Sequence, residues 1–373
     1  MSYQKRRVQA LQELTTLCQE KDSESVKTVL PFWPRIYSKI SMDQDRRVRE
    51  ACQQSHEHLC MKVHRDLAPH LRSLIGAWVL AQCDPYAPAS SVAKAAFNAA
   101  FPPAKQPAAI AFCKQQIFSM MYENVLTHTP QTLSDPKCTE PEDIESKFLR
   151  VVASSLSSLN LLLHSIAVKH ADFVEENFSS LLSEGKFWKY AKHSSFPIAS
   201  AFYSLISSIC QLSLPLSVKF ADKICPAVLH NLDNSDPVVV AALWECALNA
   251  LKAIPDCWLR VNPRKGVLPK LWQVMRKGGN GSAAIIHPHF LPLLSLIPTE
   301  VKGEGHAFYA EFFGNLKKGL FADGVCRSPR EMNAIVKAFV ECLKFTFSSA
   351  KEDENLRDFL INEVSSFLCV YDD

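Results

Sequence analysis

The sequence predicts an all-α protein, a HEAT/armadillo-like α-solenoid of stacked antiparallel helix pairs. Apolar stripes with helical spacing recur along the chain at similar intervals, and glycine is scarce. Only 11 glycines occur in 373 residues, and just two, Gly76 and Gly185, precede Gly266. Phosphate-binding loops and tight β-hairpins need glycine where φ is positive. The first two-thirds of the chain therefore disfavour a nucleotide-binding α/β fold.

One class of helix is predicted from small and apolar residues on a single face. Such residues recur at i, i+3, i+4, i+7 and i+11 from Val48, from Ile198 and from Val240, which makes one stripe on an α-helix. Weaker patterns begin near Val92 and Val151. Successive starts lie 44, 59, 47 and 42 residues apart. Apart from the second interval, this is the period of a HEAT-type repeat, which buries its apolar face by stacking on its neighbours.

A second class of helix opens with apolar residues and a proline. We expect proline in the first turn of these helices, where its missing N–H has no partner to lose. These segments are predicted to be the outer helices of the repeats. They read VLPFWPRI from Val29, ICPAVLHNL from Ile224, VLPKLWQVM from Val267 and FLPLLSLI from Phe290.

We expect a single helical repeat domain over residues 1–373, with two interruptions. Residues 127–145 hold three prolines and five acidic residues and account for the long interval, so we predict an exposed loop insertion there. Residues 276–281 form a basic glycine turn between two helices. The chain ends on Tyr371, Asp372 and Asp373 without the polar outer face of a terminal repeat, so we expect the array to continue beyond it.

Cysteine usage and the N-terminal composition point to a cytosolic or nuclear protein, and of these two we expect the cytosol. The 13 cysteines form no CxxC pair, and many lie on apolar helical faces, as buried reduced thiols do. Residues 1–13 are polar and basic, unlike a signal peptide, and no run of 18 apolar residues predicts a membrane span. The net charge of +3 is too small to indicate DNA or RNA binding by itself, but residues 1–72 carry a local excess of 13 basic over 9 acidic side chains.

Arg46, Arg47 and Arg49 open a predicted helix and are the first candidate binding residues. They could contact rRNA phosphates or an acidic partner. In solenoids an arginine at this place also pairs with an aspartate of the neighbouring repeat, which forms a ladder along the array. Arg47 and Arg49 face different sides of the helix, so one of each role is possible, and we expect at least one ladder arginine.

The basic glycine turn supplies the second set of candidate binding residues: Arg276, Lys277 and Asn280. Glycine lets a phosphate backbone approach closely, and the two cations would neutralise its charge. The simpler interpretation is a flexible turn between two helices, and sequence alone favours it.

No catalytic or metal-binding signature is found. P-loop, nucleophile-elbow, H-E-x-x-H and Rossmann patterns are absent, so no catalytic residue is proposed. His56, Cys60 and His64 have i, i+4 spacing, with Cys52 one turn earlier, and could present metal ligands. Because no second ligand pair follows, we interpret them as a mixed helix surface with a buried cysteine row beside solvated histidines. A RING domain needs eight closely spaced Cys and His ligands, and this chain has no such set.

Several stretches, in order along nearly the whole chain, resemble the N-terminal domain of the listerin family of RING-type E3 ubiquitin ligases. None is a catalytic signature, but together they are specific. Measured against that family, both ends of the domain, the long middle solenoid and the RING would be missing. The stretches are LPFWPRIYSKI at 30–40, DRRVREA at 45–51, AAFPPAKQPAAIAFCKQQI at 99–117, GKFWKYAKHS at 185–194, DCWLRVNPRKGVLPKL at 256–271 and RKGGNGSA at 276–283.

The resemblance implies a role in ribosome-associated quality control. Listerin binds stalled large ribosomal subunits, and its RING directs ubiquitin from an E2 enzyme to the nascent chain for proteasomal degradation. Its N-terminal domain docks near the sarcin–ricin loop and close to nuclear export mediator factor, and valosin-containing protein extracts the modified chain. This chain would then be a docking module without activity of its own and without cofactor, since zinc belongs to the RING. A generic α-solenoid adaptor that binds peptides or helices is the alternative.

Overall fold

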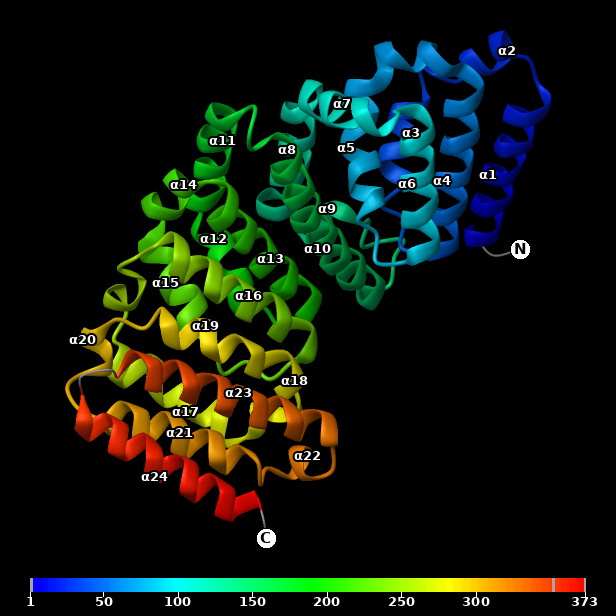
Figure 1. The fold of residues 1–373 in the computed structure, drawn as a ribbon. Coiled ribbons are helices and arrows are strands. Elements are labelled where there is room, and N and C mark those ends of the chain that lie inside the picture. The colour runs from blue at the N-terminus through cyan, green and yellow to red at the C-terminus, as the bar shows by residue number, and fades with distance from the viewer. Residues whose placement is uncertain (1–2, 351–352, 372–373) are drawn as a thin grey trace. The chain divides into compact units, whose positions relative to one another are not determined.

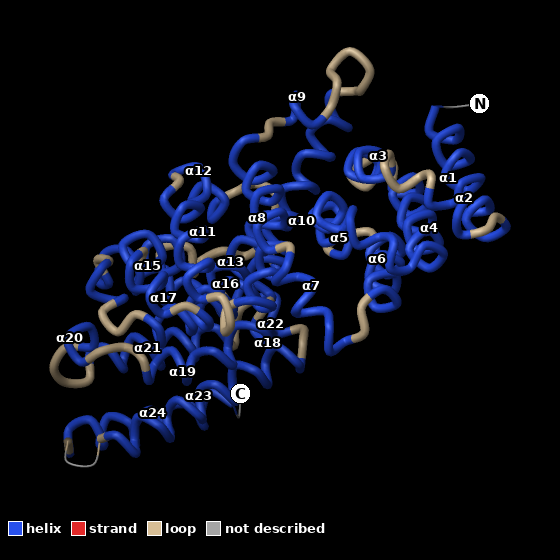
Figure 2. The backbone as a smooth tube through the Cα atoms, turned by 90° about the horizontal axis from the view of Figure 1, so that it is seen from above, coloured by secondary structure: helices blue, strands red, loops and turns tan. Residues whose placement is uncertain are grey.

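The computed structural model describes residues 3–350 and 353–371, and all regular structure in them is helical, with no strand (Figure 2). The chain divides into two compact units, residues 1–208 (unit 1) and residues 209–373 (unit 2). The boundary falls inside helix α13, and the spacing of the repeats in the sequence does not indicate it. Each unit is described by itself.

Unit 1 is built from antiparallel helix pairs joined by short turns (Figure 1). Helix α4 packs between α1 and α6, while α3 contacts both α4 and α5, and α5 contacts α8 and α10. The predicted all-α repeat architecture is confirmed. The helices are α1 (Tyr3–Glu20), α2 (Ser23–Lys27), α3 (Trp33–Ile40), α4 (Arg46–Val63), α5 (Leu71–Gln82), α6 (Ala87–Ala100), α7 (Gln106–Phe112), α8 (Lys114–Tyr122), α9 (Pro130–Leu133), α10 (Pro141–Ile166), α11 (Ala171–Ser183), α12 (Gly185–Trp188) and α13 (Phe196–Leu212).

The predicted apolar stripes face the core. Val48, Cys52 and Leu59 on α4 are fully buried, and the stripes of α13 and of the equivalent helix in unit 2 are buried in the same way. Four of the five stripes follow a turn in which a polar side chain accepts a hydrogen bond from the backbone N–H two residues later; the stripe from Val151 lies inside α10. Such Asx-type turns hold the chain in the extended geometry from which a helix starts. The pairs are Asp43 with Asp45, Asp84 with Tyr86, His193 with Ser195 and Asn234 with Asp236.

The segment 127–145, expected as a loop insertion, is partly helical. Thr129 caps the short helix α9 through a reciprocal capping box with Thr132, and α10 begins at Pro141. The irregular part is therefore residues 134–140, beside α9 in Figure 2. Proline at the first helical position of both α9 and α10 starts helices here, where the sequence analysis counted proline as a loop signal.

Among the described residues one helix, α10, is long and apolar enough to cross a membrane by length and composition, although the sequence predicted none. A second would count only if residues 185–192 and 196–212, which are bent by 118° relative to each other, formed one span. More than half of the apolar window of α10 is buried inside the molecule, and α10 packs on α5, α7 and α8. Its apolarity therefore serves the core of unit 1.

Unit 2 has shorter helices and a less regular arrangement. Helix α23 packs against α18, α19, α21 and α22. The predicted outer helices form, but Pro226 lies in the interior of its helix because that helix begins at Ala221, five residues before the proline. The helices are α14 (Leu214–Lys219), α15 (Ala221–Leu229), α16 (Pro237–Ala253), α17 (Leu268–Arg276), α18 (Ala283–Ile286), α19 (Phe290–Ser295), α20 (Thr299–Lys302), α21 (Ala307–Gly319), α22 (Asp323–Cys326), α23 (Pro329–Ser349) and α24 (Glu354–Tyr371).

Candidate docking surfaces

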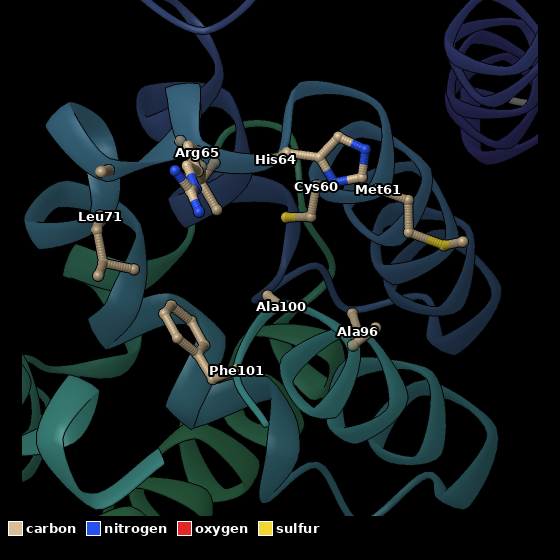
Figure 3. A pocket seen from close by; sticks show the side chains of 11 residues that line it. Cys60, Met61, His64, Arg65, Leu71, Ala96, Ala100 and Phe101 are labelled. Carbon is tan, nitrogen blue, oxygen red and sulfur yellow. The ribbon is translucent and has the colours of Figure 1, made fainter. Parts of the chain in front are cut away.

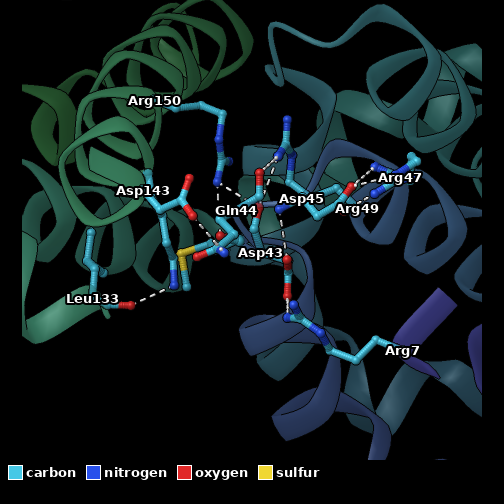
Figure 4. A network of polar contacts seen from close by, with 11 residues as sticks. Arg7, Asp43, Gln44, Asp45, Arg47, Arg49, Leu133, Asp143 and Arg150 are labelled. Carbon is cyan, nitrogen blue, oxygen red and sulfur yellow. Dashed lines mark hydrogen bonds and ion pairs between the residues drawn. The ribbon is translucent and has the colours of Figure 1, made fainter. Parts of the chain in front are cut away.

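Arg49 is the ladder arginine of unit 1. Its Nε and second terminal nitrogen bond both carboxylate oxygens of Asp84 at 2.6 and 3.1 Å. Its remaining nitrogen donates to the carbonyls of Asp43 and Gln44, which lie beside it in Figure 4. Arg49 is only 3% exposed. A guanidinium so enclosed cannot reach an external phosphate, so Arg49 leaves the set of candidate contacts.

The same network ties three helices, α1, α4 and α10, to the turn before α4. Arg150 on α10 donates to the carbonyls of Met42 and Asp43 at 3.0 and 2.9 Å, and Arg7 on α1 forms an ion pair with the Asp43 carboxylate (Figure 4). Burial, with the nearby Arg49 charge, lowers the pKa of Arg150 to about 10. A guanidinium with that pKa stays charged at neutral pH, so Arg150 and Arg7, both partly buried, help Arg49 to hold the 42–45 turn in place.

Arg46 and Arg47 remain at the surface, but neither is without a neighbour. Asp45 caps the helix by accepting from the backbone N–H of Arg47, and it also accepts from the Arg47 guanidinium at 2.7 and 3.1 Å. Hydrogen bonds from Arg47 lower the pKa of the Asp45 carboxyl. Arg46 lies over the ring of Tyr86, 5.3 Å from its centroid. Their charges are thus partly engaged by their own repeat.

The basic glycine turn of unit 2 has a rare backbone. Gly278, Gly279, Asn280 and Gly281 all have positive φ, between 53° and 82°. Each step in this left-handed region costs an ordinary L-residue about 1–2 kcal/mol, whereas glycine enters it freely and asparagine at reduced cost. The sequence GGNG therefore specifies this turn. The turn ends α17 abruptly, and Arg276 and Lys277 project from the end of the helix.

The turn is held by close backbone packing. A Cβ placed on Gly278 would lie 2.3 Å from Val325 Cγ2, and one on Gly319 would lie 2.3 Å from the carbonyl oxygen of Met275. Gly278 and Gly279 are buried. The sequence analysis expected the glycines to let a phosphate backbone approach closely. Instead, Gly278 and Gly279 let neighbouring parts of unit 2 pack closely against the turn. Only Gly281, with nothing within 4 Å of its added Cβ, leaves open space.

The three candidate residues at this turn share one exposed hollow. Arg276, Lys277 and Asn280 line a depression of about 540 Å³ together with Gly281, Phe321 and Asp323. All three are exposed, and neither cation forms an ion pair within the described residues. Phe321 is 64% exposed, which is unusual for a phenylalanine. The structure thus brings a cation pair, an amide and an aromatic ring together.

Phe321 and its surroundings were missed because they lie more than 40 residues further along the chain. The available signal was the run Lys317-Lys318-Gly319, which repeats the basic-then-glycine pattern of the first turn. Helix α21 ends there, against the end of α17. Cations in the last turns of α17 and α21 also complement the negative ends of the two helix dipoles. Of these cations, Lys317 also pairs with Glu363 at 2.8 Å, whereas Arg276 forms no ion pair among the described residues.

The His56, Cys60 and His64 pattern does not form a metal site among the described residues. The expectation of a solvated histidine is wrong for His56, which is fully buried because its ring packs among aromatic side chains. It accepts a hydrogen bond from Trp33 Nε1 at 3.0 Å and stacks on Tyr37 with centroids 4.2 Å apart. Burial lowers the pKa of His56 to about 3, which keeps the imidazole neutral. His64 is exposed at the end of α4, so the two histidines do not converge.

Stacked antiparallel helix pairs with an internal arginine–aspartate ladder define an α-helical repeat protein. Residues 4–297 match the family model described as "E3 ubiquitin-protein ligase listerin, N-terminal domain". The chain belongs to this family. It is 47% identical to E3 ubiquitin-protein ligase listerin of Gallus gallus over 351 residues, a match that covers 94% of the chain. It is 48% identical to that of Xenopus tropicalis over 347 residues, a match that covers 92% of the chain.

A more distant relative, listerin of Drosophila melanogaster, is 34% identical over 352 residues and covers 90% of the chain. These matches cover 20% of each relative, so the chain spans about a fifth of their length. Among solved structures, a crystal structure of an engineered protein covers 97% of this chain and 88% of its own, with a TM-score of 0.33 and 10% identity. That score is too low to support an argument about fold.

Proposed function

We propose that this chain is the ribosome-docking N-terminal module of a listerin-like E3 ubiquitin ligase. The observation that carries the proposal is the surface at the end of α17, where Arg276 and Lys277 project without ion-pair partners beside Asn280 and Phe321. Cations of this kind neutralise phosphates, and amides and aromatic rings contact exposed nucleotides of RNA loops. Membership of the listerin N-terminal family makes the large ribosomal subunit the fitting partner.

Arg46 and Arg47 are secondary contacts in this proposal. Both are exposed, but Asp45 and Tyr86 already engage them, so a phosphate would compete with these neighbours. Arg49 is excluded because it is buried. We therefore expect the basic turn of unit 2 to contribute more of the salt-dependent binding than the start of α4.

The remaining steps belong to the full-length ligase. In this proposal the module works in the cytosol and holds one end of the ligase on stalled large subunits, next to nuclear export mediator factor. The RING elsewhere in the ligase, with its zinc ions and an E2 enzyme, modifies the nascent chain, and valosin-containing protein acts on the product. This chain contributes position, through the shape and charge of its surface, and it contributes no catalytic group.

The test is co-sedimentation of the purified chain with isolated large and small ribosomal subunits, at about 50 and about 200 mM salt. We expect binding to large subunits only, with affinity that falls as salt rises, because phosphate contacts release counterions. The variant with Arg276→Glu and Lys277→Glu should bind at least tenfold more weakly. Its log–log salt slope should be shallower by roughly 1.5, since each lost contact to single-stranded or duplex phosphate removes about 0.7–0.9.

A matched control reverses two other exposed lysines of unit 2, Lys223→Glu and Lys252→Glu, which lie away from the turn in sequence. Circular dichroism of each variant confirms that it is folded. If the control and the Arg276/Lys277 variant lose affinity equally, the binding follows net charge and the assigned surface is wrong. Salt-independent binding, or equal binding to both subunits, would contradict the docking function itself.

A further inference from the structure

A groove in unit 1 is unrelated to the basic turn. It has a volume of about 760 Å³ and lies between the end of α4, the following segment His64–His70 and the end of α6 (Figure 3). Its lining is mostly apolar and includes Cys60, Met61, Leu71, Ala96, Ala100 and Phe101. A cavity of this size, with few polar groups, lies within the range of ligand-binding sites.

The two walls of the groove differ in chemistry. Ala96, Ala99 and Ala100 follow i, i+3, i+4 spacing on α6, so this wall is a helix face made of methyl groups. Such a face lets another backbone approach closely. On the opposite wall Met61 is 55% exposed, and a flexible thioether side chain adapts to different apolar shapes. The walls together favour a polypeptide partner with an apolar side chain that inserts between them.

The rim of the groove carries one guanidinium, that of Arg65. Arg65 and His64 line it, and Figure 3 shows both side chains at its edge. Arg65 is exposed and forms no ion pair among the described residues. The adjacent carboxylate, Asp66, pairs with Lys27 at 2.7 Å instead. The charge of Arg65 therefore stays available to a ligand, which selects for a partner with carboxylates beside its apolar anchor.

The backbone at the rim is strained. His64 has φ 46° and ψ −114°, a conformation that a residue with a Cβ rarely adopts. Strain of this kind costs about 1–3 kcal/mol and persists where the surroundings impose it, often at binding sites. Here it turns the chain sharply after α4, which opens the space between Cys60 and Leu71 and places Arg65 on the rim.

We propose that this groove binds an acidic peptide segment of a partner protein, with one large apolar side chain seated between Met61 and the alanine face of α6 and a carboxylate on Arg65. A small molecule fits less well. Small-molecule sites bury 70–90% or more of their ligand, whereas Met61, Ala99 and Ala100 leave this groove open along one side. A peptide covers such a rim with its own backbone. The inference does not depend on ribosome docking.

The experiment is a selection of random 12-residue peptides displayed on phage against the immobilised 373-residue chain. We expect enriched peptides to carry Leu, Phe or Met within a few residues of Asp or Glu. An enriched peptide, labelled with fluorescein, is then titrated by fluorescence anisotropy. Replacement of its acidic residues by lysine, or of its apolar anchor by alanine, should weaken binding at least tenfold.

Two variants of the chain locate the site. Ala100→Phe fills the groove and Arg65→Glu reverses its rim, and each should weaken binding at least tenfold. Ala87→Phe, at the opposite end of α6, and Arg35→Glu, on α3, are exposed controls and should bind like the parent chain. The proposal is overturned if no peptide is enriched, if the enriched peptides are basic, or if they bind the two groove variants as tightly as the controls.

Discussion

The start of α4 and the turn after α17 both present short runs of basic residues, and the structure uses them in opposite ways. At α4 the cations are engaged within unit 1: Arg49 is enclosed by Asp84 and two carbonyls, and Arg47 by Asp45. At the turn after α17, Arg276 and Lys277 have no carboxylate partner within the described residues. One run mainly builds the repeat, and the other is available to a partner.

The two regions differ in the partners that the nearby chain provides for the basic side chains. Helix α4 begins after a turn rich in aspartate and free carbonyls, which attract arginine side chains inward. Helix α17 ends in a left-handed glycine turn whose buried members, Gly278 and Gly279, have no side chains to pair with a cation. A run of basic residues is therefore evidence for an external contact only when its neighbours cannot neutralise it.

The largest effect is expected where the cation is structural. Asp84→Ala should destabilise unit 1 by about 3–5 kcal/mol, because it leaves the Arg49 charge buried without its partner. The double variant Arg49→Met with Asp84→Leu should recover most of this loss, since it removes both charges. Hydrogen exchange measured on peptides from α4 and α6 reports the change. Equal destabilisation by the single and double variants would show that packing matters more than charge.

The second largest loss of stability is expected from a substitution in the glycine turn after α17. Gly278→Ala should cost about 2–5 kcal/mol, since it combines left-handed strain with a clash against Val325. Gly281→Ala has a similar backbone but open space, so it should cost only about 1–2 kcal/mol. Urea denaturation followed by circular dichroism measures both. Equal costs would mean that the tight packing of the turn contributes little.

The helical stripes were predictable because they are local. The stripes from Val48, Ile198 and Val240 start within the first turn or so of α4, α13 and α16, as expected, since a helix face is specified within about a dozen residues. The role of Arg49 was one of two open possibilities, because its partner Asp84 lies 35 residues away. The arrangement of the glycine turn depends on Val325 and Gly319, and the groove depends on α6 meeting the end of α4. Contacts of that separation leave no periodic trace in a single sequence.

The third effect depends on pH. Burial lowers the pKa of His56 to about 3, and of His287, which packs beside Gly279 under the turn, to about 4. The unfolded chain binds these protons near pH 6.5, so each neutral histidine stabilises the fold above that pH, and the stability falls as pH drops toward the folded pKa. Between pH 7.5 and 5.5 each should cost about 1.4 kcal/mol.

Variants separate the two histidines from the carboxylates that titrate in the same direction. The free energy of unfolding is measured by urea denaturation at pH 7.5 and pH 5.5 for the parent chain, His56→Gln and His287→Gln. The comparison gives the part of the pH-induced loss that is due to each histidine. The pH-induced loss should shrink by about 1.4 kcal/mol in each variant. An unchanged pH dependence for His287→Gln would mean that the space beneath the turn admits water and the imidazole titrates normally there.

The smallest effect is expected at the exposed cations, and it completes the comparison with Asp84. Arg276→Gln with Lys277→Gln removes both charges from the end of α17. It should lower the free energy of unfolding by no more than about 0.5–1 kcal/mol, because exposed cations at a helix C-terminus contribute about that much. Urea denaturation measures this against Asp84→Ala. A loss of about 3 kcal/mol or more, the range of a broken buried ion pair, would place these cations in the same structural class as Arg49. A weakened ribosome interaction in charge-reversed variants would then report on the fold of unit 2 rather than on a lost contact.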